Sequence, residues 1–166
     1  GLYRRPSYIT ENNNGDVVVS DSIFPSGAVV VTERGGRHRF SYTGHPSGSG
    51  LWPWGICTDA LSHILVCDDR TVQMLNKDGQ FLSHLLTKSQ EMGRPWSLSY
   101  DVNTHRLWVG SYNNNKVCVY SYIDTQDALT DEYTHSTDED THSRDEDTHS
   151  RDEDVFSSST PAVEWR

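Results

Sequence analysis

The chain has 166 residues, enough for one domain, with 34% hydrophobic residues and a formal net charge of −10 at pH 7. The acidity lies in one part: residues 1–123 hold 11 Lys or Arg and 10 Asp or Glu, whereas residues 124–166 hold 3 and 14. No apolar run reaches the length of about 20 residues that a membrane-spanning helix needs, and the first residues lack the apolar stretch of a signal peptide. We therefore expect no membrane partner, and the missing initiator Met leads us to expect a fragment of a longer chain.

The first part of the chain is expected to form four short strands. Val-rich runs alternate with turns that contain Gly, Asn and Asp, residues that tolerate positive φ or cap the backbone. The expected strands lie at 7–11, 16–21, 27–33 and 38–42, with a longer loop over 22–26.

Two further units follow. The second has expected strands at 55–59, 63–68, 71–76 and 80–87, and a connector over 88–94 leads to the third. The third has expected strands at 97–101, 106–111 and 116–123. No fourth strand is expected there, because the residues that follow are polar and acidic.

The three units repeat one another. DVVVSD starts at 16, HILVCD at 63 and RLWVGS at 106, so the starts differ by 47 and 43, and each unit opens on a proline (Pro6, Pro53, Pro95). A period near 45 with about four short strands is typical of a β-propeller blade. We predict an all-β, partial propeller of about three blades at 6–43, 53–87 and 95–123. Closed propellers have about 4 to 8 blades, so this open arc is expected to self-associate through its uncovered edges.

A family resemblance follows from these residues. Pro53, Gly55 and Ile56, the step from Val66 to Asp68, and the ending at Asp78, Gly79 and Phe81 resemble an NHL repeat, whereas the Gly-His and Trp-Asp pairs of WD40 repeats are missing at matching positions. The strings GDVVVSD, HRFSYTG, GICTDALSHILVCD, DGQFL and RLWVGSYNNNKVCVY resemble the C-terminal NHL propeller of tripartite-motif proteins. The resemblance covers residues 6–123. It implies a parent protein with RING, B-box and coiled-coil modules ahead of the propeller, and many such parents are E3 ubiquitin ligases. No RING or B-box zinc module is in this chain.

The C-terminal part, residues 124–166, has a different composition. THSTDED at 134–140 is followed by THSRDED at 141–147 and 148–154, and no position of this heptad is apolar, which excludes a coiled coil. Dense like charge without hydrophobic residues predicts a disordered acidic tail. His135, His142 and His149 are interpreted as solvated copies of the repeat rather than as metal ligands.

No catalytic residue, cofactor or metal site is predicted. Asp21, Asp68 and Ser111 share one place in successive units, and the two carboxylates are interpreted as caps of the next turn; His63 and His105 are interpreted as turn residues. Nucleophile-elbow, P-loop and HExxH patterns are missing. Cys57, Cys67 and Cys118 form no CxxC pair and are expected to be free, buried thiols, which favours a reducing, cytoplasmic location.

A binding surface is the stronger prediction. In a propeller, the segments that lead into the first strands share one rim with the loops between second and third strands. The residues expected on this rim are Arg5, Trp54, Arg94 and Trp96 from the leading segments and Asp69, Arg70, Tyr112, Asn113, Asn114 and Asn115 from the loops. Arg, Trp and Tyr are enriched at the energetic centres of interfaces. The alternative for Trp54 and Trp96 is that they wedge between blades.

These observations predict a non-catalytic module that binds a protein partner. By the resemblance, that partner would be a ubiquitination substrate. The alternative is binding of single-stranded RNA, since NHL propellers of the resembled family include RNA readers, and stacking on aromatic and Arg side chains suits unpaired bases. The net charge of +1 over residues 1–123 is small for an RNA-binding surface, so we favour a protein partner.

Overall fold

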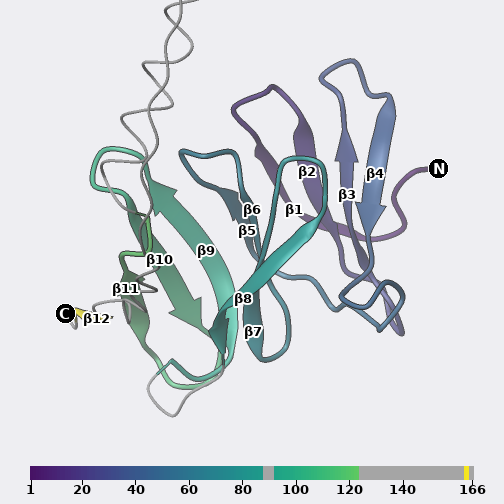
Figure 1. Cartoon of the computed structure of the whole chain (residues 1–166). Coiled ribbons are helices and arrows are strands. Elements are labelled where there is room, and N and C mark those ends of the chain that lie inside the picture. The colour runs from purple at the N-terminus through teal and green to yellow at the C-terminus, as the bar shows by residue number, and fades with distance from the viewer. Residues whose placement is uncertain (88–91, 124–162, 165–166) are drawn as a thin grey trace, which may run out of the picture.

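The computed structural model describes residues 1–87, 92–123 and 163–164, which form three antiparallel four-stranded sheets and, within those ranges, no helix. Figure 1 shows the sheets side by side, with the β5–β8 sheet between the other two. The first sheet contains β1 (Pro6–Glu11), β2 (Val17–Asp21), β3 (Ala28–Thr32) and β4 (His38–Tyr42). The second contains β5 (Ile56–Thr58), β6 (Ile64–Cys67), β7 (Thr71–Leu75) and β8 (Phe81–Thr87). The all-β prediction is confirmed.

The third sheet corrects one prediction. It contains β9 (Pro95–Asp101), β10 (Arg106–Ser111), β11 (Val117–Tyr120) and β12 (Val163–Glu164). A three-stranded sheet was expected, but β12 pairs antiparallel with β11, Val119 opposite Glu164 and Tyr120 opposite Val163. The backbone of residues 163–164 therefore supplies a fourth strand, although it lies in the part of the chain predicted to be disordered. The THSRDED repeats lie outside the described residues.

Each sheet follows chain order, with its first strand beside the first strand of its neighbour: β1 contacts β5, and β5 contacts β9. This is the arrangement of successive propeller blades. The repeat is also visible in the turns, because positive φ angles recur at Gly15 (83°), Ser62 (64°) and His105 (52°), just before the second strand of each sheet. The chain is thus a partial propeller of three blades.

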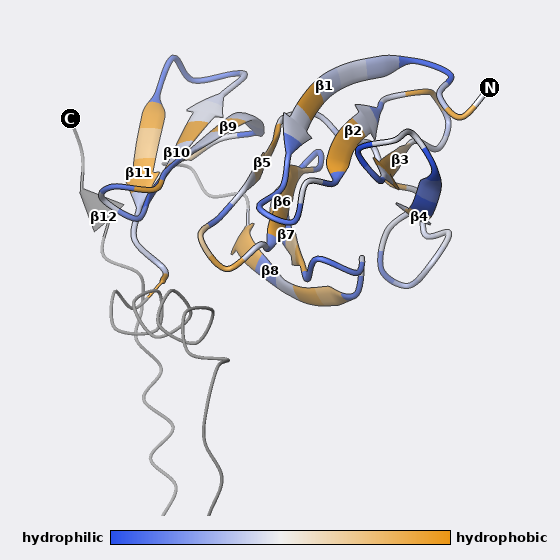
Figure 2. Cartoon of the chain, turned by 90° about the horizontal axis from the view of Figure 1, so that it is seen from above, coloured by the Kyte–Doolittle hydropathy of each residue, from blue (hydrophilic) through white to orange (hydrophobic). Residues whose placement is uncertain are grey.

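Alternation along β6 explains why the middle sheet is buried on both faces. Ile64 and Val66 belong to the apolar cluster against the first sheet, and Leu65 and Cys67 belong to the cluster against the third. All four side chains are fully buried. In Figure 2 the hydrophobic colour lies on strands of all three sheets, among them β2, β6 and β11.

The outer sheets are covered less completely on their far faces. Ile9 of β1 lies on the side away from the core and is 73% exposed, although its cross-strand neighbour Val19 is only 3% exposed. Trp108 and Val117 alternate with the buried Leu107, Val109 and Cys118 and are also exposed. The far faces therefore expose some large apolar side chains, and self-association through them remains a prediction.

The three cysteines are free and buried, as predicted. Burial raises the pKa of the Cys57 and Cys67 thiols, which keeps them protonated. All three belong to the apolar cluster between the second and third sheets. They therefore act as small apolar residues.

Candidate functional site

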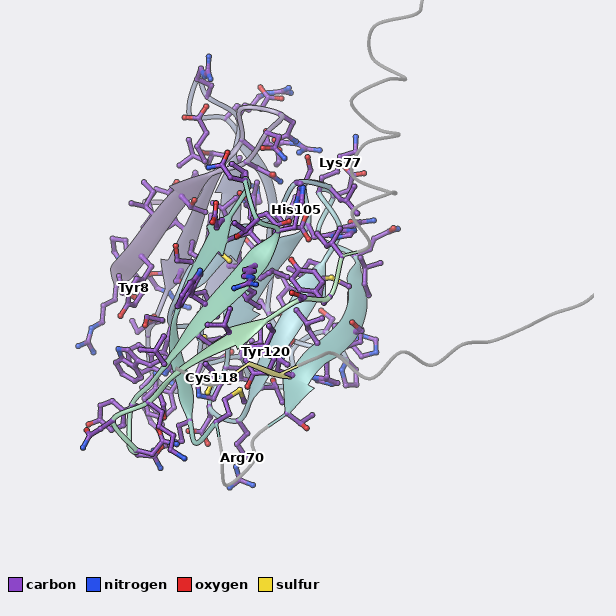
Figure 3. The ribbon with its side chains drawn as sticks, turned by 90° about the vertical axis from the view of Figure 1, so that its left-hand side faces the viewer. Tyr8, Arg70, Lys77, His105, Cys118 and Tyr120 are labelled. Carbon is purple, nitrogen blue, oxygen red and sulfur yellow. The ribbon has the colours of Figure 1, made fainter. Side chains whose placement is uncertain are left out.

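One rim collects the segments that lead into first strands and the loops between second and third strands. In Figure 3 this rim is at the lower end of the molecule, where Arg70 is labelled, and Lys77 and His105 lie toward the opposite end. The Trp54 N–H donates to the Cys67 carbonyl at 2.9 Å, and the Ser20 hydroxyl donates to the Trp54 carbonyl at 2.5 Å. These bonds fix the leading segment of the second sheet against the first sheet and against its own β6.

The loop after β10 is fixed in a similar way. The Tyr112 N–H donates to the Arg94 carbonyl at 2.9 Å, and the Arg94 N–H donates to Asn113 Oδ1 at 2.9 Å. Gly93 leaves room for this loop, because a Cβ there would lie 2.6 Å from both Asn113 Oδ1 and Ser111 Oγ. Loop and leading segment thus form one unit at the base of the third sheet.

Five aromatic rings form a continuous series along the rim, which we call the aromatic row: Phe24, Trp52, Trp54, Trp96 and Tyr112. Trp54 and Trp96 stack with centroids 4.0 Å apart and an interplanar angle of 25°. Tyr112 lies 4.7 Å from Trp96, and Trp52 lies 5.7 Å from Trp54. Phe24 completes the series, with an edge contact to Trp52 at 6.0 Å. The row spans all three sheets.

A groove of about 190 Å³ runs beside the row and is lined by Trp52, Trp54, Asp69, Arg94, Pro95, Trp96 and Tyr112. The Asp69 carboxylate forms an ion pair with Arg94, and Arg70 Nε lies 3.5 Å from the second Asp69 oxygen. The Arg70 side chain is 76% exposed. The groove therefore combines ring surface with an ion pair whose carboxylate already has two cationic neighbours.

The residues predicted for the rim are placed as follows. Five of them line the groove: Trp54, Asp69, Arg94, Trp96 and Tyr112. Arg70 adjoins it through Asp69, and Asn113, Asn114 and Asn115 form the loop after Tyr112, with Asn115 at φ 56°. Arg5 does not line the groove; its N–H donates to Asp21 in the first sheet.

The sequence interpretation missed Phe24, Trp52 and Pro95. Phe24 lies in the loop between β2 and β3, which corresponds to the loops that carry Arg70 and Tyr112, so the repeat contained the necessary signal. Trp52 lies two residues before Trp54, across Pro53. The proposed wedge between blades applies in part: Trp54 is half-buried against the second apolar cluster, yet it also lines the groove.

The carboxylates at the ends of β2 and β6 anchor backbone. Asp21 accepts N–H groups from Arg4, at 3.0 Å, and from Arg5, so it fixes the segment before β1 rather than the next turn as expected. Asp68 Oδ1 accepts the Asp69 N–H at 2.6 Å, which is the expected cap. Burial raises the pKa of Asp68.

The two candidate histidines are turn residues with nearby partners. His63 Nδ1 lies 2.9 Å from Asp59, and His105 Nδ1 lies 2.8 Å from the Tyr100 hydroxyl. Among the described residues, no group of three or more His, Cys, Asp or Glu side chains is arranged to hold a metal ion.

A second, polar groove of about 610 Å³ lies among the loops around Asn13, Gly15, Arg34 and Arg39. Its charges are already paired: Arg34 with Glu11, and Arg39 with both Asp16 and Asp78. No aromatic side chain lines it. The aromatic row is therefore the better candidate for a binding surface.

Comparison with known proteins gives a limited similarity. The chain is 45% identical over 42 residues to Protein wech of Drosophila melanogaster, a match that covers 24% of this chain and 5% of that protein. No protein-family model matches the chain. The solved structure of PorZ, a bacterial surface component of the type-IX secretion system of Porphyromonas gingivalis, superposes with a TM-score of 0.45 at 15% identity, over 76% of this chain and 19% of PorZ. That likeness is too low to support the fold, which rests on the geometry of the chain itself.

No helix long and apolar enough to cross a bilayer occurs in the described ranges.

Proposed function

We propose that this chain is a non-catalytic protein-interaction module and that the aromatic row with its groove is the binding surface. The observation that carries the proposal is the stacking of Trp54 on Trp96 across two sheets, flanked by the exposed rings of Trp52 (41%) and Tyr112 (62%). Rings held in place by their neighbours lose little conformational freedom on binding, and Trp, Tyr and Arg dominate the binding energy of protein interfaces.

The proposal includes no chemical step. The carboxylates of Asp21 and Asp68 hold backbone N–H groups, and His63 is engaged by Asp59. The resemblance to tripartite-motif propellers extends the proposal to the parent protein, in which the module recruits a protein for ubiquitination by modules outside this chain. The buried free thiols fit a reducing, cytoplasmic compartment.

Single-stranded RNA is the second candidate, because stacked rings lie next to Arg70 and Arg94. Bases stack on aromatic side chains, and Arg contacts phosphate. Filter binding of a uridine-rich RNA over a salt series tests it, since phosphate contacts give a steep loss of affinity with salt.

The protein-interaction proposal is tested by selecting a peptide-display library on the immobilised chain and measuring the selected peptides in solution against two variants. Trp96→Ala removes a ring from the row, and we expect it to weaken binding at least 10-fold. Trp108→Ala removes an exposed indole from β10, on a sheet face that does not line the groove, and is expected to bind like the unmodified chain. Selected peptides that bind both variants equally, or a library that yields no binder, would overturn the proposal.

A further inference from the structure

Three tryptophans line the groove, and each carries an indole N–H donor. Within the described ranges, no residue accepts a hydrogen bond from the indole Nε1–H of Trp52, Trp54 or Trp96, although all three side chains line the groove. Indole N–H groups in interfaces usually find an acceptor on the partner. A ligand in this groove therefore gains if it presents free carbonyl oxygens.

The ring geometry restricts the ligand further. Because Trp54 and Trp96 lie 4.0 Å apart, their facing surfaces are closed to any inserted group. Free ring surface remains at the ends of the groove, on Trp52 and Tyr112. This arrangement favours a ligand that runs along the row over a series of flat bases that must stack between rings.

The groove is small and lies away from the sheet edges. At about 190 Å³ it takes a few side chains of a partner rather than a whole secondary-structure element. Its lining comes from loops and strand ends rather than from a free sheet edge, which disfavours strand addition. We therefore favour an extended segment whose side chains enter the groove one after another.

One exposed cation lies beside the groove. Asp69 is engaged by Arg94 and Arg70. Asp68 accepts hydrogen bonds from the Trp52 N–H and from Gln73, whereas Arg70 keeps 76% of its side chain exposed. Arg5, farther along the rim, is also exposed. An acidic side chain next to the bound segment would therefore be attracted at this rim.

We propose, resting on the proposed function, that the groove binds a proline-rich segment in the polyproline II conformation with acidic residues next to the prolines. Polyproline II has no internal hydrogen bonds, so its carbonyl groups are available to the indole donors. Its prolines pack on aromatic surface, and its stiffness reduces the entropy lost on binding. Trp52 and Tyr112 provide the ring surface, and Arg70 selects the acidic residues.

The test uses the full chain and fluorescein-labelled peptides of repeating Glu-Pro-Pro units, read by fluorescence anisotropy. We expect saturable binding. A peptide with Ala in place of every Pro has the same charge and is expected to bind at least 10-fold more weakly. A peptide with Lys in place of Glu keeps the prolines and is expected to bind more weakly at low salt. Equal affinity for the Pro and Ala peptides, or no binding of the Pro peptide, would overturn the inference.

Variants of the chain test the assigned residues. Trp96→Phe keeps a ring but loses the donor, and a loss of about 2- to 10-fold is expected for one hydrogen bond. Arg70→Glu is expected to weaken the Glu-Pro-Pro peptide and to strengthen the Lys-containing one. Trp108→Ala is the matched control, and circular dichroism confirms that each variant is folded. An unchanged affinity in Trp96→Phe would overturn the role of the indole donors.

The outcomes separate this inference from the proposed function. If the display-selected peptides lack proline and their binding requires Trp96, the inference is overturned and the proposed function stands. If uridine-rich RNA binds in a way that requires Trp96 and no peptide binds, both the inference and the proposed function are overturned. Binding of the Glu-Pro-Pro peptide that depends on Trp96 but not on Trp108 supports both.

Discussion

The Tyr122 hydroxyl donates a 2.8 Å hydrogen bond to Asp59 Oδ2 and thereby joins the segment after β11 to the turn after β5. Asp59 is 1% exposed. Its other oxygen accepts the N–H groups of Leu61 and His63, both at 2.9 Å. A carboxylate removed from water is tolerated only when its oxygens are satisfied, so this residue ties the turn, the second sheet and the third sheet together.

Tyr122→Phe is expected to destabilise the fold. The substitution keeps the ring contact with Tyr100 but leaves Asp59 short of one donor. Loss of a hydrogen bond to a charged group costs about 1.5–3 kcal/mol, which urea denaturation would measure. Tyr3→Phe, at an exposed residue, is the control with the same chemical change. Equal unfolding free energies in the two variants would contradict the assigned role of Tyr122.

Alkaline pH is expected to unfold the protein through its buried tyrosines. Burial raises the pKa of Tyr42 to about 12 and that of Tyr100 to about 12, and it also raises the pKa of Tyr122. Because these folded-state pKa values lie above the unfolded value of about 10, the stabilisation is complete below pH 10. It is lost as pH rises toward 12, since the unfolded chain releases its protons first.

Tyr42→Phe tests this pH dependence. It removes one shifted group, so the slope of unfolding free energy against pH should become shallower by up to about 1.4 kcal/mol per pH unit between pH 10 and 12. Urea denaturation over a pH series measures the slope. Tyr42 also donates to Gln73 at 2.5 Å, so the variant is expected to be less stable at neutral pH. A parallel downward shift at every pH would contradict the titration argument.

Gly55 is expected to be essential for the packing of the second sheet on the third. A Cβ at this position would lie 2.6 Å from the Trp96 carbonyl oxygen and 2.7 Å from Ser97 Cα. The Gly55 N–H donates to the same Trp96 oxygen at 2.8 Å. Gly55→Ala should therefore cost about 1–3 kcal/mol through overpacking. Gly35→Ala, where no atom lies within 4 Å of the new Cβ, is the control; equal stability of the two would contradict the contact.

Much of the fold was predictable because the repeat is carried by local chemistry. Apolar runs of four to seven residues and turns that require positive φ place the strands to within two or three residues of their observed ends. The two-residue strand β12 was not predictable, since a pairing of that length leaves no periodicity in the sequence. It also lies more than 40 residues beyond β11, so no turn signal connects the two strands.

The candidate site was predictable in part for the same reason. Trp54 and Trp96 follow equivalent prolines, so the repeat alone places them on one rim. Their stacking at 4.0 Å and the Asp69–Arg94 pair depend on how neighbouring sheets pack, which no local pattern encodes. Arg5 falls outside the groove because its backbone is held by Asp21 of the first sheet, whereas the groove is lined by Trp52 and by residues of the second and third sheets.

Self-association is expected to occur through the outer faces of the first and third sheets. Trp108 is 39% exposed and Val117 is 54% exposed, and they project from adjacent strands of the third sheet on the face away from its core. Burial of such a patch between copies is favourable. Trp108→Lys combined with Val117→Lys should therefore raise the monomer fraction in light scattering. A monomeric unmodified chain at high concentration would contradict the expectation.

The acidic residues after 124 are expected to act on the rim by charge. Residues 124–166 have a net charge of −11, and the exposed Arg5 and Arg70 lie on the rim. Deleting residues 128–160 removes the repeats but keeps β12. It should raise the affinity for a polyanion such as heparin at low salt and reduce solubility. The difference in polyanion affinity between the deletion variant and the full chain should vanish at high salt. Charges more than about 8 Å apart are already screened at physiological ionic strength, and more salt screens them further.

A second deletion separates charge from strand pairing. Removing residues 128–166 takes away β12 as well and leaves the edge of β11 unpaired, so this variant should aggregate more than the 128–160 deletion. Both variants have lost the repeats, so they should bind the polyanion alike. If both variants match the full chain in polyanion affinity at every salt concentration, the repeats have no electrostatic role. If both also match it in solubility, β12 does not protect the sheet edge.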